Sequence, residues 1–150
     1  MNHEQVTKVK VLSALNIQTI STNTTTNGNI IDTRGFDSIL FAFQTGTVTD
    51  GDYLPLIQED DDAAMGSASA VADGDLRFIN SSGAMVATGQ EAAAGFTADT
   101  DDNKVSKIAY VGTKRYVRFN IVSTNASSGA VLGALAVLSD ANIAGVASNQ

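Results

Sequence analysis

The stretch RYVRFNIVSTNASSGAVLGALAVL, residues 115–138, contains two strand patterns in succession, separated by a polar turn at 125–128. Side chains of a strand point alternately to its two faces, so every second residue shares a face. The first pattern has an apolar and a polar face, which are Val117, Phe119 and Ile121 opposed to Tyr116, Arg118 and Asn120. This alternation predicts a strand with one face in a core and the other near solvent.

The second pattern, from Gly129 to Leu138, is apolar on both of its faces. One face carries Ala130, Leu132, Ala134, Ala136 and Leu138, and the other carries Val131, Gly133, Leu135 and Val137. A strand of this kind is normally covered on both sides. We therefore expect the core to cover one face and a partner, such as a second subunit, to cover the other. The contact candidates are Val131, Leu135 and Val137.

Further strand patterns lie on the N-terminal side of this stretch, at 6–12, 38–43, 53–58 and 105–111. The dipeptide Asp50-Gly51 favours a hairpin between the second and third of them, and Gly112 to Lys114 suggests another hairpin before Arg115. Asn27-Gly28 predicts a tight turn, since both residues tolerate a positive φ. Pro55 has no N–H to donate, so its strand is expected at an edge or with a bulge.

The spacing of these patterns indicates an all-β class. Roughly seven to nine short strands without a convincing helix favour an antiparallel β-sandwich, jelly-roll-like and with long loops. We expect a single domain over residues 1–150, with loops and short strands across 59–104. The ends, 1–6 and 140–150, are predicted to be flexible arms.

Composition narrows the function classes. The chain has 9 Lys and Arg against 16 Asp and Glu, a net charge of −7 that disfavours nucleic acid and anionic membrane surfaces as partners. It has no Cys, and its one His is His3 in the predicted N-terminal arm, which leaves little for thiolate or imidazole chemistry. The G-x-S-x-G elbow, the P-loop and the G-x-G-x-x-G turn are also missing. We therefore expect no enzymatic activity and no cofactor.

One acidic stretch has a partial calcium-binding pattern. Asp99, Asp101 and Asn103 have the spacing of the first three ligands of an EF-hand loop. The match ends there, because position six is Lys104 and position twelve is Tyr110, where the motif needs Gly and Glu. Two interpretations stay open, a weak Ca²⁺ site or solvated turn residues, and we favour the second.

The basic residues are concentrated between 104 and 118. They are Lys104, Lys107, Lys114, Arg115 and Arg118, five of the nine in the chain. One interpretation is a patch that binds an acidic surface, such as the run at 59–62 of a neighbouring copy. The other is a set of outward positions on two adjacent strands that discourages edge pairing. Lys114, Arg115 and Arg118, with Tyr116 beside them, are the polar contact candidates.

Two segments resemble a family of small tailed-bacteriophage virion proteins. They are GNIIDTRGFDSILFAFQTGTVTDGDYLPLIQEDDDA, which starts at Gly28, and DDNKVSKIAYVGTKRYVRFNIVSTNASSGAVLGALAVL, which ends at Leu138. The likeness rests on an I-D-T-x-G-F/Y-D-S stretch, a G-x-V-T-D-G-x-Y hairpin and a V-G-x-K-R-Y-V-R strand. Proteins of this family resemble capsid decoration, or cement, proteins that bind outside the major capsid lattice.

The resemblance implies a structural virion protein on the capsid exterior that is made in the host bacterial cytoplasm. Its implied partners are the major capsid protein and further copies of itself, with a trimer favoured. Glu4, Lys8 and Lys10 interrupt the apolar block that a signal peptide would need, which fits this expectation. The alternatives are a tail or head-fibre module that binds host-surface glycans and, with the least support from the residues, a Ca²⁺-dependent depolymerase.

Overall fold

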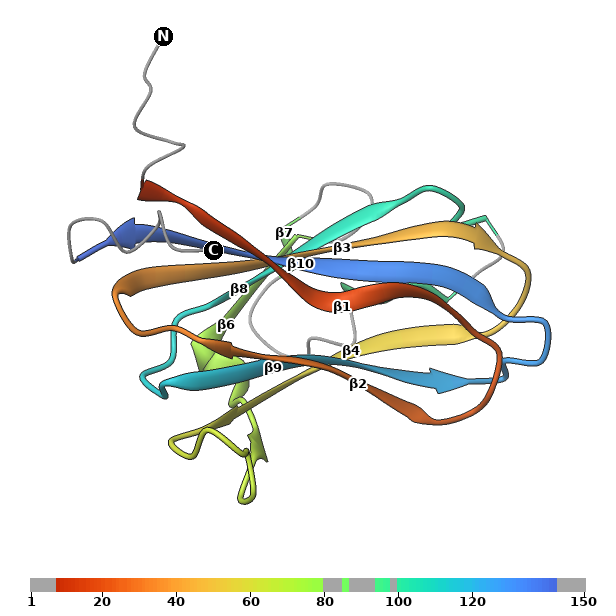
Figure 1. Ribbon diagram of the computed structural model, residues 1–150. Coiled ribbons are helices and arrows are strands. Elements are labelled where there is room, and N and C mark those ends of the chain that lie inside the picture. The colour runs from red at the N-terminus through yellow and green to blue at the C-terminus, as the bar shows by residue number, and fades with distance from the viewer. Residues whose placement is uncertain (1–7, 80–84, 87–93, 98–99, 143–150) are drawn as a thin grey trace, which may run out of the picture.

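The computed structural model describes residues 8–79, 85–86, 94–97 and 100–142 of the chain. These residues form two antiparallel sheets that pack face to face (Figure 1), which confirms the predicted all-β sandwich. Within these ranges no helix is long and apolar enough to cross a membrane.

Ten strands and one 3-10 turn are found in the described residues. They are β1 (Lys10–Ile20), β2 (Thr25–Asp32), β3 (Phe36–Val48), β4 (Asp52–Asp60), β5 (Ser69–Ala70), the turn η1 (Asp73–Asp75), β6 (Leu76–Ile79), β7 (Met85–Val86), β8 (Val105–Tyr110), β9 (Tyr116–Thr124) and β10 (Ala130–Ala141). Sheet A has the strand order β1-β10-β3-β8-β6-β7, and sheet B has the order β2-β9-β4-β5.

The strand pairs are nested along the chain. Strand β1 pairs with β10, β2 with β9, β3 with β8 and β4 with β5. The chain is thus one long hairpin rolled up so that successive pairs fall in opposite sheets, which is the arrangement of a jelly roll. This roll places β10, the strand with two apolar faces, between β1 and β3 inside sheet A (Figure 1).

Two connections that were predicted as hairpins cross between the sheets instead. Strand β3 lies in sheet A and β4 in sheet B, so the Asp50-Gly51 turn joins strands that do not pair. The loop from Gly112 to Lys114 likewise joins β8 of sheet A to β9 of sheet B. Both hairpin predictions are wrong because a short turn with a glycine reverses the chain equally well within one sheet or across a sandwich. At the first turn Gly51 has a φ of +99°, which glycine adopts without strain.

The Asn27-Gly28 pair lies inside β2, where a turn was predicted. The register of β2 against β9 shifts between Asn27 and Ile30, so this stretch is a bulge. A Cβ at Gly28 would lie 2.2 Å from the carbonyl oxygens of both Ala14 in β1 and Phe119 in β9. The glycine is therefore needed for the close approach of three strands and not for a positive φ, which Gly28 does not have.

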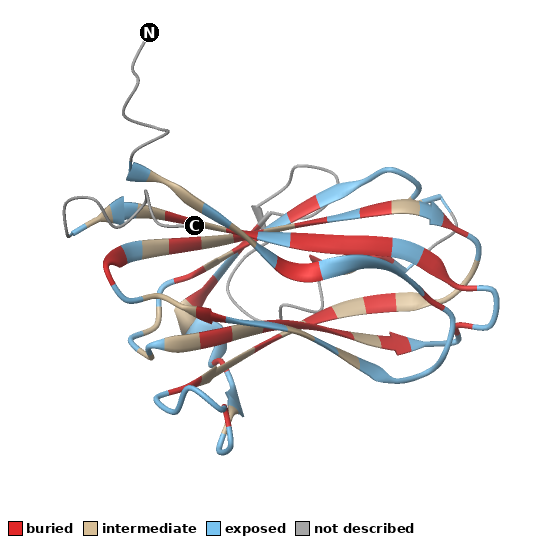
Figure 2. Ribbon diagram, in the orientation of Figure 1, coloured by how far each residue is buried: buried red, intermediate tan, exposed pale blue. Residues whose placement is uncertain are grey.

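Aromatic contacts join the two sheets in the core. The Phe119 ring of β9 lies with its centroid 5.7 Å from that of Phe41 and 5.1 Å from that of Phe43, both in β3. Phe96 meets Phe43 edge-on at 5.3 Å. Buried residues alternate mainly with half-buried ones along β3 and β9 (Figure 2), as the sequence pattern predicts, except that Asn120 of the predicted polar face is fully buried.

The position of Pro55 in β4 suits a residue that has no backbone N–H to donate to a neighbouring strand. Strand β5 pairs only with Gln58 and Glu59, so β4 is unpaired on that side at Pro55, as predicted for an edge position. On the other side Pro55 lies opposite Ile121 of β9.

The C-terminal strand extends into the segment that was predicted as an arm. Asp140 and Ala141 belong to β10, and the Asn142 side chain donates a hydrogen bond to Asp37 at 2.7 Å. Residues 1–6 and 143–150 of the two predicted arms lie outside the described residues.

Candidate functional site

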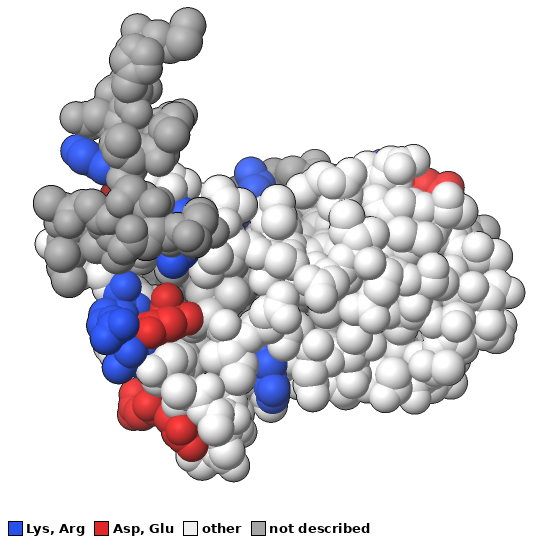
Figure 3. Space-filling model, viewed as in Figure 1, with Lys and Arg blue, Asp and Glu red and all other residues white. Residues whose placement is uncertain are grey.

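Charged side chains gather at one end of the sandwich (Figure 3). This end, which we name the charged end, is formed by the segment that follows β2, the end of β4 and the loop between β8 and β9 (Figure 1). Along the rest of the visible flank, Lys, Arg, Asp and Glu are sparse (Figure 3). The charged end is therefore a distinct polar surface.

Arg115 and Asp32 form a bidentate ion pair at the charged end, between β9 and β2. Arg115 Nε donates to Asp32 Oδ1 at 3.1 Å, and its Nη2 donates to Oδ2 at 2.9 Å. The guanidinium carbon also lies 4.8 Å from the centroid of the Tyr116 ring, a cation–π contact. The bond to Arg115 is the main cause that holds the pKa of Asp32 below its usual value. Arg115 is thus fixed in one orientation while its side chain stays 42% exposed.

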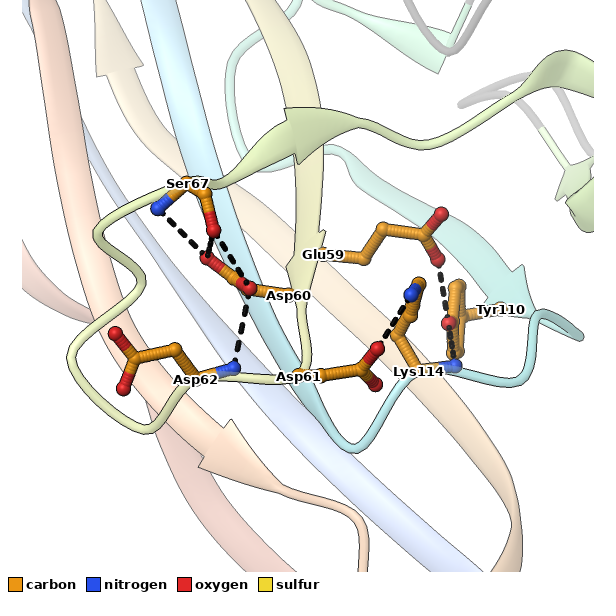
Figure 4. Close-up of polar contacts among 7 residues, drawn as sticks. All are labelled: Glu59, Asp60, Asp61, Asp62, Ser67, Tyr110 and Lys114. Carbon is orange, nitrogen blue, oxygen red and sulfur yellow. Dashed lines mark hydrogen bonds and ion pairs between the residues drawn. The ribbon is translucent and has the colours of Figure 1, made fainter.

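Lys114 links the loop between β8 and β9 to the end of β4 (Figure 4). Its Nζ lies 2.5 Å from Asp61 Oδ2, and this ion pair raises the pKa of Lys114. Beside the pair, the Tyr110 hydroxyl donates to Glu59 Oε2 at 2.6 Å and accepts the Lys114 backbone N–H at 2.9 Å. Burial, and then the bond to Glu59, raise the pKa of Tyr110 well above its ordinary value. These contacts fix the loop against sheet B.

The carboxylate of Asp60 organises the turn that follows β4 (Figure 4). It accepts the backbone N–H of Asp62 at 3.1 Å and that of Ser67 at 2.9 Å. These two hydrogen bonds, the first above all, lower the pKa of Asp60. The acidic run at 59–62 therefore makes its contacts within its own chain, whereas one sequence interpretation placed it against a neighbouring copy.

The basic residues between 104 and 118 are divided between the sheets. Those before Gly112 belong to β8 of sheet A or its start, and those after it lie at or in β9 of sheet B. The interpretation of outward positions on two adjacent strands is wrong for this reason. Arg118, in β9, donates from Nη2 to Gln58 Oε1 at 2.6 Å, and its Nε is buried without a hydrogen-bond partner. Lys114, Arg115 and Tyr116 remain together at the charged end.

The outward side of sheet A carries an apolar surface, which we name the apolar face. It consists of Val11 and Ile17 on β1, Val131, Leu135 and Val137 on β10, Leu40 and Ala42 on β3, and Val105 and Ala109 on β8. In one row across the strands, Leu135 lies between Ser13 and Ala42. The three apolar contact candidates all point outward here, with Val131 and Leu135 exposed and Val137 half-buried.

A groove of about 620 Å³ lies in the apolar face. Small residues, among them Ala42 and Gly46, line it together with the larger Ile17, Val105 and Leu135. Ile17 crosses above Gly133, because a Cβ there would lie 2.8 Å from Ile17 Cγ1. The sequence reasoning missed Ile17 and Val105 as site residues, since only the strand register brings Ile17 beside β10 and places Val105 across β3 from it. The available signal was the break in alternation near residue 14, where β1 has bulges that turn Ile17 outward.

The residues with the partial calcium pattern take part in a turn. Asp101 Oδ2 accepts the Thr97 N–H at 3.1 Å, and Asn103 has a left-handed φ of +55°. Asp99 lies outside the described residues. Within the described ranges, no three His, Cys, Asp or Glu side chains form a group that could hold a metal ion. Asp101 thus acts here as a turn-forming carboxylate.

All nine aromatic residues of the chain lie in the described part, and eight of them are buried. The exception is Tyr116, which is half-buried and carries the Arg115 guanidinium over its ring. A sugar-binding platform needs exposed aromatic faces. The described residues offer no exposed aromatic face of this kind, and the two surfaces described above are a set of ion pairs and an apolar sheet face.

No protein-family model and no curated protein sequence matches this chain. Among solved structures, the chain is similar to the crystal structure of the SPBc2 prophage-derived protein YomS, with a TM-score of 0.51 and 11% sequence identity. The superposition covers 87% of this chain and 93% of that one. At this identity the likeness establishes a shared fold.

Proposed function

We propose that this protein is a structural, non-enzymatic virion protein of a tailed bacteriophage that binds the outside of the capsid lattice and stabilises it. The observation that carries the proposal is the jelly-roll fold, shared over 87% of the chain with a prophage-derived protein. The segments that resemble phage decoration proteins support it, since they span β2 to β4 and β8 to β10, the main part of both sheets.

The charged end is the surface that we assign to the capsid. Lys114 and Arg115 are already held by Asp61 and Asp32, so little side-chain freedom is lost when they meet a partner. Their side chains are 43% and 42% exposed, which leaves donors free for carboxylates of a capsid subunit. A rim of fixed charges of both signs also favours one docking orientation over others.

Preferential binding to the lattice is sufficient to stabilise a particle. A protein that binds the assembled lattice and not its free subunits shifts the assembly equilibrium by mass action. At a concentration of about 100 times Kd, the gain is about 2.7 kcal/mol per site. A copy that bridges neighbouring subunits would add this gain at each place where subunits meet.

The test uses particles of the parent phage from which the gene has been deleted. Purified protein is added, and we expect it to co-sediment with the particles and to restore their resistance to heat inactivation. The proposal fails if the protein does not co-sediment and the deletion leaves heat resistance unchanged. Immunogold labelling at tail tips with a bare capsid would also contradict it and favour the glycan-binding alternative.

Variants at the charged end test the docking surface. Arg115→Ala removes a fixed guanidinium and should lower particle affinity at least about tenfold, which corresponds to about 1.4 kcal/mol. The matched control is Lys104→Ala, which removes an exposed cation before β8, at the opposite end of that strand. If the two variants bind the particle with equal affinity, the charged end is not the surface that binds the capsid.

A further inference from the structure

We infer that the apolar face of sheet A binds a second copy of this chain. Seven large hydrophobic side chains are exposed in the described residues, and five of them lie on this face. They are Val11, Ile17, Val105, Val131 and Leu135. Exposed apolar side chains gathered on one face mark an interaction surface, whereas scattered ones need no explanation.

The shape of the face is suited to a copy of itself. Small residues such as Gly46 and Ala42 line the low part of the groove, while Leu135 and Ile17, which covers Gly133, stand beside it, and Ile17 is 83% exposed. Each copy therefore offers both a groove and the side chains that would fill one. A twofold axis makes such a contact twice, because Ile17 and Leu135 of each copy enter the groove of the other.

The charges favour a second copy at this face over any other face. The chain carries a net charge of −7, so two copies repel each other where their carboxylates meet. Among the described residues, the outward positions of β1, β10, β3 and β8 alongside Val131 to Val137 hold no Asp or Glu, and the exposed Asp37 and Asp140 lie at one end of β3 and β10. The one charge at these outward positions is Lys107, in the row of Leu135 and Ala42. With the twofold axis parallel to β10, this lysine lies above β1 of the other copy, where the outward residues Val11, Ser13 and Ile17 carry no charge.

The size of the face agrees with an interface core. Four strands about 4.8 Å apart, and the outward positions from Val131 to Val137 at about 3.4 Å per residue, cover a flat patch of roughly 400 Å². A standard interface buries about 800 Å² of accessible surface on each partner. The apolar side chains of this patch supply most of the core of such an interface, with Gln44 between Gly133 and Val105 as a polar member. Ser13 and Asn16 on the edge strand β1 supply part of its rim.

The first experiment measures the mass of the purified full-length protein by sedimentation equilibrium, without any capsid. We expect twice the 15.5 kDa of one chain, and a return to one chain in Leu135→Glu, because a buried carboxylate would face apolar groups in the contact. The matched control is Ile30→Glu, since Ile30 is 40% exposed but lies on β2 of sheet B, outside the apolar face. This control should keep the wild-type mass.

The second experiment covers the case in which Leu135→Glu disturbs folding. The chain has no cysteine, so Ile17→Cys places a single thiol on the most exposed side chain of the face. At a protein concentration of about 100 times Kd, maleimide labelling should slow about tenfold relative to a dilute sample. Ile30→Cys, on β2 of sheet B, should label at one rate throughout.

The two readouts separate this inference from the proposed function. A single-chain mass for wild type, or labelling of Ile17→Cys that does not depend on concentration, overturns the inference. If Ile17→Cys is protected only after addition of capsids, the face binds the particle, and the inference is again wrong. Failure to bind capsids, in contrast, leaves both measurements on the purified protein unchanged.

Discussion

Asp50 and Gly129 are 79 residues apart in sequence, yet Asp50 Oδ1 accepts the Gly129 backbone N–H at 2.7 Å. The same carboxylate accepts the N–H groups of Ser127 and Ser128 at 3.1 and 3.0 Å, and the Ser127 hydroxyl as well. One side chain thus joins the turn between β3 and β4 to the turn between β9 and β10. These hydrogen bonds, that of the Ser127 hydroxyl first, hold the pKa of Asp50 far below its usual value.

In the acid range, the stability of Asp50→Asn should depend less on pH than that of wild type. Because the folded pKa of Asp50 is depressed, its contribution is present above the unfolded pKa of about 3.9 and is lost as pH falls below it. We therefore expect a lower Tm than wild type at pH 7, and a difference that shrinks as pH falls from about 5 to 2. Thermal melts across this range give the comparison. Asp73→Asn in the exposed turn η1 is the control, and a wild-type Tm profile for Asp50→Asn would contradict the prediction.

Tyr110→Phe should change stability at alkaline pH. The hydroxyl bonds to Glu59 and to the Lys114 N–H are both lost, so the free energy of unfolding should fall by about 1–2 kcal/mol at pH 7. The folded pKa of Tyr110 is raised, so its contribution is fully present below the unfolded pKa of about 10 and is lost as pH rises above it. Urea denaturation at pH 7 and at higher pH should show a smaller alkaline loss in the variant.

The control for this prediction is Tyr116→Phe. Tyr116 is half-buried, and a phenylalanine ring there keeps the cation–π contact with Arg115. Its free energy of unfolding and its alkaline loss should therefore match those of wild type. If Tyr110→Phe loses stability above pH 10 as steeply as this control, the assignment of the alkaline transition to Tyr110 is wrong.

Phe119 should be among the most costly core positions to truncate. Its ring is fully buried and contacts both Phe41 and Phe43, which are the core side chains of the facing sheet. Phe119→Ala should lower the free energy of unfolding by about 3–5 kcal/mol, through lost burial and the cavity that remains. Phe119→Leu should lose less, about 1–2 kcal/mol, since most of the volume is kept. Guanidinium denaturation measures both, and equal losses would contradict the cavity explanation.

The strands could be predicted from the sequence because each carries its own alternation. The buried positions Phe41 and Phe119 and the two apolar faces of β10 follow from a period of two residues, which needs no knowledge of the neighbouring strand. Pairing is different, because it depends on contacts between distant segments. The turns at Asp50-Gly51 and at Gly112 have the composition of hairpins, although each leads from one sheet to the other.

In the candidate site, likewise, the residues of a single strand could be predicted from the sequence, whereas the contacts between strands could not. Val131 and Leu135 could be named because their own strand shows the second apolar face. Ile17 could not be assigned to that face, because the bulges of β1 shift its alternation and only the register against β10 brings it above Gly133. The basic residues looked adjacent in sequence, and the crossing at Gly112 separates them in space.

Gly28→Ala should be strongly destabilising, although the exchange adds one methyl group to a strand. The new Cβ would lie 2.2 Å from the carbonyl oxygens of both Ala14 and Phe119. Both neighbours are backbone atoms, so no side-chain rotation relieves the overlap, and β2 must move away from β1 or β9. The expected loss is about 3 kcal/mol in the free energy of unfolding, measured by urea denaturation.

Gly74→Ala is the matched control for this exchange. No heavy atom lies within 4 Å of a Cβ at Gly74, so its stability should stay within about 0.5 kcal/mol of wild type. Hydrogen exchange adds a local readout, since the Gly28 N–H donates to Asn120 Oδ1 at 3.3 Å and the amides of β2 should exchange faster in Gly28→Ala. Equal stability of the two alanine variants would mean that β2 does not need a glycine at its bulge, and that the three strands meet less closely than the structure indicates.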